Sequence, residues 1–226
     1  MSIKPLVEPK SRFCKKSYWI LNAARDTASE LLLLFDEPNG QPRGPGVPSN
    51  ADQDLLRSML IFAGAGLDAS IKQLIKETFP IIVEKDDTAQ SKVIEHFSKL
   101  VGRAETASSK DLVRWLFQDK PRNAMIDDLI QELTSNSLQS KQQVEKVVEY
   151  MKLDRRNVLT VGDQELKAAF DVRNLIIHEL DVDFSRPAMA GKRTRTQRRR
   201  DEMVKHTNAV IAIASGFLSE VDKKLS

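Results

Sequence analysis

Apolar residues recur at helical spacing in four long segments of the chain. A repeat of three or four residues is typical of a helix that buries one face. The segments run from about Ser11 to Phe35, from Asn50 or Asp52 to Phe79, from Asp163 to Asp181, and from Arg199 to Lys224. The second is expected to end at Phe79, because proline disfavours helical backbone in the residue before it and Pro80 follows. The pattern predicts an all-α bundle of four long helices.

Two stretches of different composition interrupt this bundle. Residues 36–50 contain four prolines and three glycines, so they are expected to form an exposed loop. Residues 86–162 contain only short amphipathic segments, near 90–102, 109–117, 123–134 and 141–153. We therefore expect residues 1–85 and 163–226 to form the two halves of the bundle, with 86–162 as a helical insertion between them.

The second long segment contains a stretch of small and apolar residues, MLIFAGAGLDASI at 59–71. Gly64 and Gly66 each cost roughly 1 kcal/mol of helix propensity relative to alanine. This cost indicates that another helix approaches closely there. Asp68 is the single charged residue in the stretch.

The third long segment holds the residues with the most chemistry. At about 100° per residue, its apolar side chains cover a wide arc, which predicts a largely buried helix. Its polar side chains form one narrow stripe, made of Lys167, Asp171, Asn174, His178 and Asp181. Asn174 and His178 are one turn apart on this stripe, so the amide can orient the imidazole.

Arg173 is placed against the pattern, near the centre of the apolar arc. An unpaired arginine there is costly, so it needs a carboxylate or a route to a cleft or a subunit interface. Asp68 is a candidate partner, because it is also an isolated charge in apolar surroundings. The alternative is that Arg173 forms a structural ion pair and that His178 is a surface histidine.

Charge is concentrated in one run, although the net charge is only +3. The run KRTRTQRRR contains no acidic residue and six basic ones: Lys192, Arg193, Arg195, Arg198, Arg199 and Arg200. Such a run forms either a solvated loop or a surface that contacts nucleic-acid phosphates. Its place shortly after Arg173 and His178 favours the phosphate-binding interpretation.

Several classes of protein lack support in the sequence. Cys14 is the only cysteine, which excludes an intramolecular disulfide and a metal cluster built on thiolates. A protein kinase, a P-loop enzyme and a zinc enzyme are disfavoured, since no glycine-rich phosphate loop or ligand cluster occurs; no metal or cofactor is expected. The polar, proline-containing start and the short apolar runs, such as LLLLF at 31–35, predict a cytoplasmic protein without a membrane span.

The segment DVRNLIIHELDVDF at 171–184 resembles the active-site segment of HEPN-domain ribonucleases, including the MAE-type and RiboL-PSP-type nucleases. The family signature is an arginine, a polar residue and, after a short gap, a histidine, which correspond here to Arg173, Asn174 and His178. The trailing Glu179, the acidic position Asp68 on a helix of small residues and the closing helix after a basic loop also fit. The resemblance covers roughly 11–80 and 163–224 and implies a HEPN-like bundle.

The resemblance further implies metal-independent RNA cleavage by a homodimer whose two motif helices meet across a two-fold axis. The ribose 2′-OH would attack the adjacent phosphate, His178 would transfer the proton, and Arg173 would stabilise the phosphorane charge. Asn174 would fix the ring or hold a phosphate. Such enzymes often resemble toxins or antiviral defence effectors, so an inhibitor or defence-system partner is also implied.

Two alternatives remain open in the sequence. One is a HEPN-like dimerisation or RNA-binding module that no longer cleaves; loss of the arginine or the histidine would mark it, and both residues are present. The other is a nucleic-acid-binding protein that acts through residues 192–200 alone. It predicts interleaved aromatic residues or a recognition helix, and the run contains neither.

Overall fold

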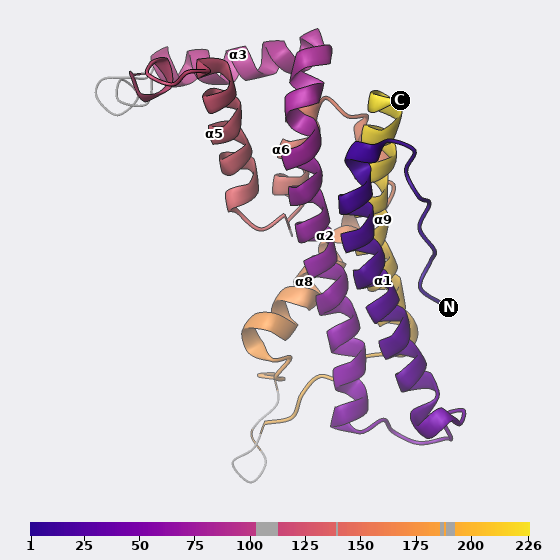
Figure 1. The fold of residues 1–226 in the computed structure, drawn as a ribbon. Helices are drawn as coiled ribbons and strands as arrows, with labels where there is room; N and C mark the ends of the chain where they lie inside the picture. The colour runs from indigo at the N-terminus through magenta and orange to yellow at the C-terminus, as the bar shows by residue number, and fades with distance from the viewer. Residues whose placement is uncertain (103–112, 139, 186–187, 189–192) are drawn as a thin grey trace.

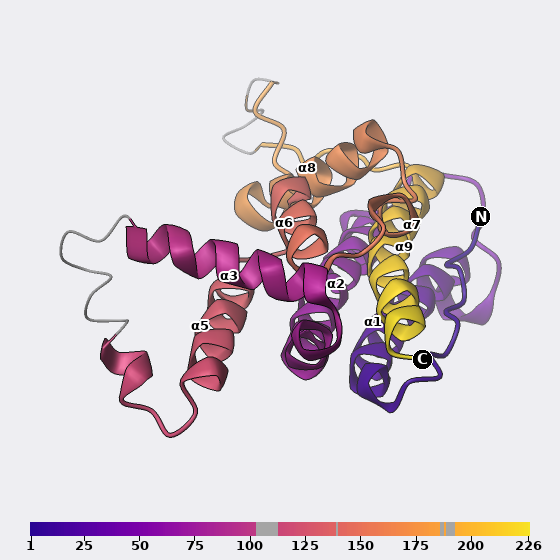
Figure 2. The same ribbon diagram turned by 90° about the horizontal axis from the view of Figure 1, so that it is seen from above.

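The computed structural model describes residues 1–102, 113–138, 140–185, 188 and 193–226. Helices form most of this part of the chain, and the prediction of an all-α protein is confirmed. Strand-type pairing within these residues is limited to an isolated bridge between Val182 and Arg195. The three longest helices, α1 (Lys15–Asp36), α2 (Asn50–Lys85) and α9 (Arg200–Leu225), run side by side (Figures 1 and 2).

Helix α2 is longer than the sequence predicts. Ser49 and Asp52 form a capping box at its start, and the helix continues through Pro80 to Lys85. The expected end at Phe79 is therefore wrong. An internal proline costs about 3 kcal/mol. Burial of Ile82 and Val83 offsets that cost, because each apolar side chain removed from water contributes about 1.5–3 kcal/mol.

The close helix approach expected at the glycines of α2 is confirmed at Gly66. A Cβ added to Gly66 would lie 2.3 Å from the Cβ of Ala24 on α1. Only glycine therefore allows the two helix axes to come this close. The contact between α1 and α2 is the most extensive one between helices in the described chain.

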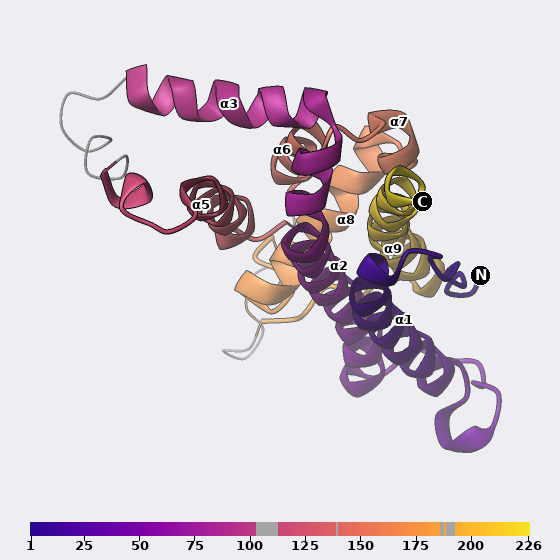
Figure 3. The same cartoon turned by 45° about the horizontal axis from the view of Figure 1, so that its top comes forward.

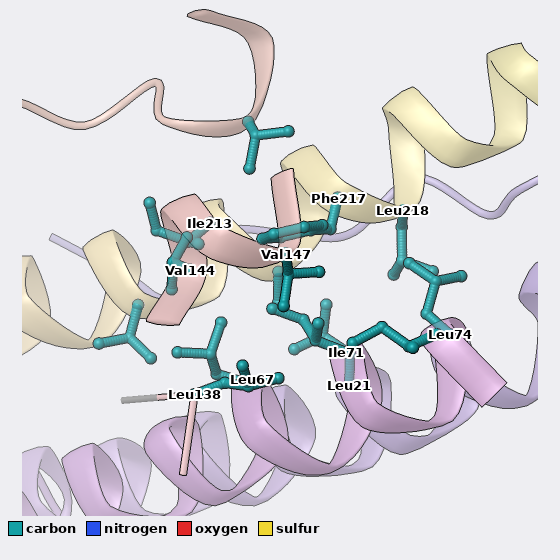
Figure 4. Packing of buried hydrophobic residues seen from close by; sticks show 14 of the residues in the cluster. Leu21, Leu67, Ile71, Leu74, Leu138, Val144, Val147, Ile213, Phe217 and Leu218 are labelled. Carbon is teal, nitrogen blue, oxygen red and sulfur yellow. The ribbon is translucent and has the colours of Figure 1, made fainter. Parts of the chain in front are cut away.

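The segment between the two bundle halves is helical where it is described. It contains α3 (Asp87–Gly102), α5 (Pro121–Ser135), α6 (Lys141–Met151) and the short α7 (Arg155–Val158). Figures 1 and 3 show α3 projecting from the end of α2, with α5 beside it. Val144 and Val147 of α6 join the same buried cluster as Leu67 of α2 and Phe217 of α9 (Figure 4).

Helix α8 (Asp163–Glu179) lies across α2 and α9 and carries the Arg173 motif. The last helix, α9, starts and ends within one residue of its predicted bounds. Two short 3-10 turns, η1 (Arg12–Cys14) and η2 (Pro38–Gly40), flank α1.

Within the described residues, α2 is long and apolar enough to cross a membrane by length and composition. This stretch is longer than the apolar runs on which the sequence analysis relied. However, 56% of its most apolar window is buried inside the fold. The core helix of a soluble bundle can have the same length and composition as a membrane-spanning helix.

Candidate functional site

Helix α8 has one side buried in the bundle and one side exposed to solvent. Five side chains hold it against α2 and α9: Leu166, Ala169, Phe170, Val172 and Ile176. The predicted polar stripe faces solvent, with Lys167, Asp171 and His178 exposed and Asn174 half-buried. The pattern therefore gives the orientation of this helix correctly along most of its length.

The C-terminal part of α8 is more open than the wide apolar arc predicts. Ile177 is 36% exposed and Leu180 is 65% exposed. Ile177 follows Arg173 by one helical turn and lies on the same side of α8, and Leu180 is the left-handed residue directly after the helix. We call Arg173, Ile177 and Leu180 the open face. An apolar surface around an arginine is the kind of surface that a partner or a ligand covers.

Arg173 is half-buried, and its hydrogen bonding is incomplete. Nη1 donates to Oδ1 of Asn174 at 3.0 Å, whereas Nε is buried and has no hydrogen-bond partner within the described chain. Burial lowers the pKa of the guanidinium, and the charge of Asp68 opposes that effect only in part. A buried donor without an acceptor costs about 1–3 kcal/mol, so an acceptor such as a water or an anion would stabilise this site.

Asp68 does not form the ion pair with Arg173 that its isolation in the sequence suggests. Its Oδ1 accepts a hydrogen bond from the backbone N–H of Leu138 at 2.7 Å, and its Oδ2 lies 2.9 Å from Nζ of Lys72. Asp68 thus ties α2 to the segment before α6 and acts on Arg173 only through its field.

The remaining motif residues lie in the last turns of α8. The carbonyl oxygen of Asn174 accepts from Arg173, and no hydrogen bond joins Asn174 to His178; the expected orientation of the imidazole by the amide is not seen. His178 is exposed, on the stripe one turn beyond Asn174. The Glu179 side chain is exposed and has no hydrogen bond or ion pair within the described residues.

The basic run is mostly engaged by the chain itself. Arg195 pairs with Asp54 at 2.7 Å, Arg198 with Asp181 at 2.5 Å and Arg200 with Asp36 at 2.6 Å. These three guanidinium groups already have carboxylate partners, with which a phosphate would have to compete, and the phosphate-binding surface stays a prediction. Arg193 lies over the ring of Phe184, 5.1 Å from its centroid.

Arg199 differs from these arginines. Arg199 precedes α9, and its exposed side chain has no hydrogen bond or ion pair in the described part of the protein. Lys192 lies outside the described residues. Arg199 is thus the arginine of the run with the clearest freedom to meet a phosphate.

A buried ionic network behind α8 was missed by the sequence analysis. Arg57 of α2 is 2% exposed and donates from Nε to Asp181 at 2.9 Å, from Nη1 to Asp54 at 3.0 Å and from Nη2 to the carbonyl of Thr196 at 2.7 Å. Arg198 donates to both carboxylate oxygens of Asp181. Burial raises the pKa of Asp181, but the hydrogen bonds from Arg198 and Arg57 outweigh it and the net pKa lies below its usual value.

The chain turns sharply to bring Asp181 into this network. Leu180 and Asp181 have φ values of 50° and 60°, in the left-handed region that such residues rarely occupy. Asp181 was expected on the exposed polar stripe, and this is wrong, because α8 ends at Glu179 and the turn directs the carboxylate inward. The sequence contains one sign that an arginine needs a buried carboxylate partner. Arg57, like Arg173, lies among apolar residues, next to Leu56.

No group of three or more His, Cys, Asp or Glu side chains is arranged to hold a metal ion among the residues that the structure describes. Comparison of the chain with protein-family models, with curated proteins and with solved structures finds no match. The function is therefore inferred from the motif of α8 and from the geometry around it.

Proposed function

We propose that this protein is a metal-independent endoribonuclease of the HEPN type that acts as a homodimer. The observation that carries the proposal is Arg173, whose buried Nε has no acceptor in the described chain; the same helix carries an exposed histidine, His178, on its polar stripe. A phosphate group of RNA supplies the missing acceptor. Charge-assisted hydrogen bonds from a desolvated guanidinium are stronger than those formed in water.

The chemistry uses the substrate's own nucleophile. The 2′-oxygen forms a bond to phosphorus while the bond from phosphorus to the 5′-oxygen breaks. The proton of the 2′-OH is removed by a histidine, and the 5′-oxygen receives a proton as it leaves. The products are a 2′,3′-cyclic phosphate and a 5′-hydroxyl, and no water is consumed. Two copies of His178, one from each protomer, supply a base and an acid.

The homodimer is proposed from the open face. Ile177 and Leu180 are exposed apolar side chains near Arg173, and a second copy of the open face is proposed to cover them, with the polar stripes that carry the two His178 at the edge of the contact. Arg199 is proposed to contact the RNA backbone outside this centre, as is Lys192.

The test is cleavage of RNA by purified protein in the presence of EDTA. Arg173→Ala and His178→Ala are each expected to reduce the rate by about 10²–10⁴, because each removes a group that acts on the transition state. Asn174→Ala is expected to slow cleavage less, since its amide only holds Arg173. RNA with 2′-deoxyribose at the cut should not be cleaved.

The matched control is Arg156→Ala on α7. This arginine is exposed and has no side-chain partner in the described structure, so wild-type activity is expected. His206→Ala is not a suitable control, because His206 is 6% exposed and its loss would leave a cavity in the core. Full activity of His178→Ala, or inhibition by EDTA, would contradict the proposed mechanism. Absence of cleavage by the wild-type protein would leave the alternative of a dimerisation or RNA-binding module.

We also propose that the cleavage acts as a toxin or a defence effector, held in check by an inhibitor or a defence-system partner. The proposal rests on the resemblance of the motif. Expression of the chain in growing cells is expected to arrest growth, and His178→Ala is expected to relieve the arrest. Equal toxicity of the two forms would contradict it.

A further inference from the structure

A pocket of about 410 Å³ lies directly beside the motif, between the first turn of α6 and α8. The side chains that bear on its chemistry are Gln142, Gln164, Lys167, Phe170, Asp171 and Asn174. Phe170 supplies an apolar wall, and the others supply amide, carboxylate and ammonium groups. The volume falls within the range of about 300–1,000 Å³ that is typical of small-molecule and cofactor sites.

Four polar side chains of this pocket have no partner in the described chain. Gln142, Gln164, Lys167 and Asp171 have no side-chain hydrogen bond or ion pair in the described residues. Lys167 and Asp171 are four residues apart on one helix, a spacing at which opposite charges often pair, and they do not. At the rim, by contrast, Nζ of Lys141 lies 2.6 Å from Asp163.

The pocket is continuous with the candidate active site. Asn174 lines the pocket and accepts the hydrogen bond from Arg173. His178 lies one turn further along α8, which is about 6 Å along the helix axis. A strand that places a phosphate at Arg173 therefore has a neighbouring nucleotide within reach of the pocket.

We infer that this pocket binds the base of a nucleotide next to the cleaved bond and gives the ribonuclease its sequence preference. The inference rests on the proposed function. Proteins read single-stranded RNA by placing unstacked bases in pockets and bonding to their edges. Amide groups such as those of Gln142 and Gln164 both donate and accept. The carboxylate of Asp171 accepts from an exocyclic amine, which adenine, cytosine and guanine have and uracil lacks.

The test uses an RNA pool of randomised sequence and maps the ends that the wild-type protein produces. We expect a preference for an amino-bearing base over uracil at one position beside the cut. Asp171→Ala, Gln164→Ala and, on α6, Gln142→Ala are each expected to reduce that preference by about tenfold. All three side chains are exposed, so the fold should persist by circular dichroism. Arg156→Ala should keep the wild-type preference.

The possible results separate the two proposals. Cleavage without a base preference, or with a preference that none of the three variants changes, contradicts the proposed role of the pocket in base selection. The proposal of a ribonuclease is unaffected by either result. If the wild-type chain does not cleave, the proposed function is wrong. The role of the pocket is then tested by measuring RNA binding. Full-length His178→Ala is then titrated with labelled oligouridine and oligoadenosine, and equal affinity overturns the pocket. Tighter binding of oligoadenosine that Asp171→Ala abolishes supports it.

Discussion

Two arginines lie among apolar side chains in this protein, and their surroundings differ. Arg57 donates hydrogen bonds to Asp181, Asp54 and a backbone carbonyl, so its charge is fully accommodated. Arg173 donates only to the amide of Asn174, and its buried Nε has no acceptor. Complete pairing indicates a structural role for Arg57. Incomplete pairing indicates that Arg173 awaits a ligand or a partner.

The shared carboxylate of the network gives a prediction at this scale. Asp181→Asn is expected to lower the free energy of unfolding by about 3–5 kcal/mol, because it removes the carboxylate shared by Arg198 and Arg57 and leaves the buried Arg57 with only the half-exposed Asp54 as a counter-charge. Urea unfolding monitored by circular dichroism measures the change. Asp127→Asn on α5, an exposed residue without a partner in the described chain, should stay within about 0.5 kcal/mol of wild type. A loss of about 0–1 kcal/mol, as for a surface pair, would contradict the prediction.

The position of Asp181 also shows why the sequence could predict only part of the site. A regular helix carried to residue 181 places this side chain with Asn174 and His178. The helix stops two residues earlier, and two left-handed residues reverse the direction in which the side chain points. Periodicity contains no signal for that turn. Likewise, the isolation of Asp68 and Arg173 in sequence says that each needs a partner, but not which one.

At the scale of elements, apolar spacing was sufficient to find the long helices and to orient α8. The end of α2 was not predictable from local rules, because the cost of Pro80 is outweighed by tertiary burial of the residues that follow it. A close approach by another helix at the glycines of α2 was predictable, because glycine lowers helix propensity and allows tight packing. The structure shows that this helix is α1.

That approach gives a prediction about Gly66. Gly66→Ala is expected to destabilise the protein by about 1–3 kcal/mol, because the new Cβ overlaps the Cβ of Ala24 on α1. The double variant with Ala24→Gly should recover most of the loss, which a double-mutant cycle in urea measures. Gly44→Ala, where the new Cβ meets nothing within 4 Å, is the control. Strict additivity of the two changes would contradict the contact.

Helix α9 contributes a pH dependence through His206. Burial lowers the pKa of this histidine, against the opposing charge of Glu202 at 3.6 Å; Arg198 also lowers it and Glu165 raises it. A histidine with a lowered pKa binds fewer protons when folded than when unfolded. Stability should therefore fall as the pH drops below the unfolded value of about 6.5.

Urea unfolding between pH 8 and pH 5 measures this effect, and His206→Met should reduce the slope below pH 6.5. Part of the slope should persist, because burial also lowers the pKa of His96. The pKa of Asp181 is lowered below its usual value, so its contribution is lost only at more acidic pH. An identical slope in His206→Met would contradict the prediction.

At the scale of the whole molecule, the open face predicts the state of assembly. The protein is expected to be a homodimer that buries at least roughly 1,200 Å² in total, the low end for stable complexes. Ile177→Lys should produce monomers, because it places a second positive charge beside Arg173 at the centre of the interface. Light scattering at micromolar concentration measures both, and Leu33→Lys, another exposed apolar position, should remain dimeric. A monomeric wild-type protein would contradict the prediction.

The network around Arg57 also has a consequence for how the protein folds during its synthesis. Arg57 leaves the ribosome long before its counter-ion Asp181 and its neighbour Arg198 are synthesised. Until then, the half-exposed Asp54 is the carboxylate partner of Arg57 that has been synthesised, and the buried one is missing. A chain truncated after Glu179 should therefore lack the cooperative unfolding of the full chain, and native-like unfolding of that fragment would contradict this. On the proposed function, the nascent chain is expected to stay inactive toward RNA until Asp181 and Arg198 have been synthesised.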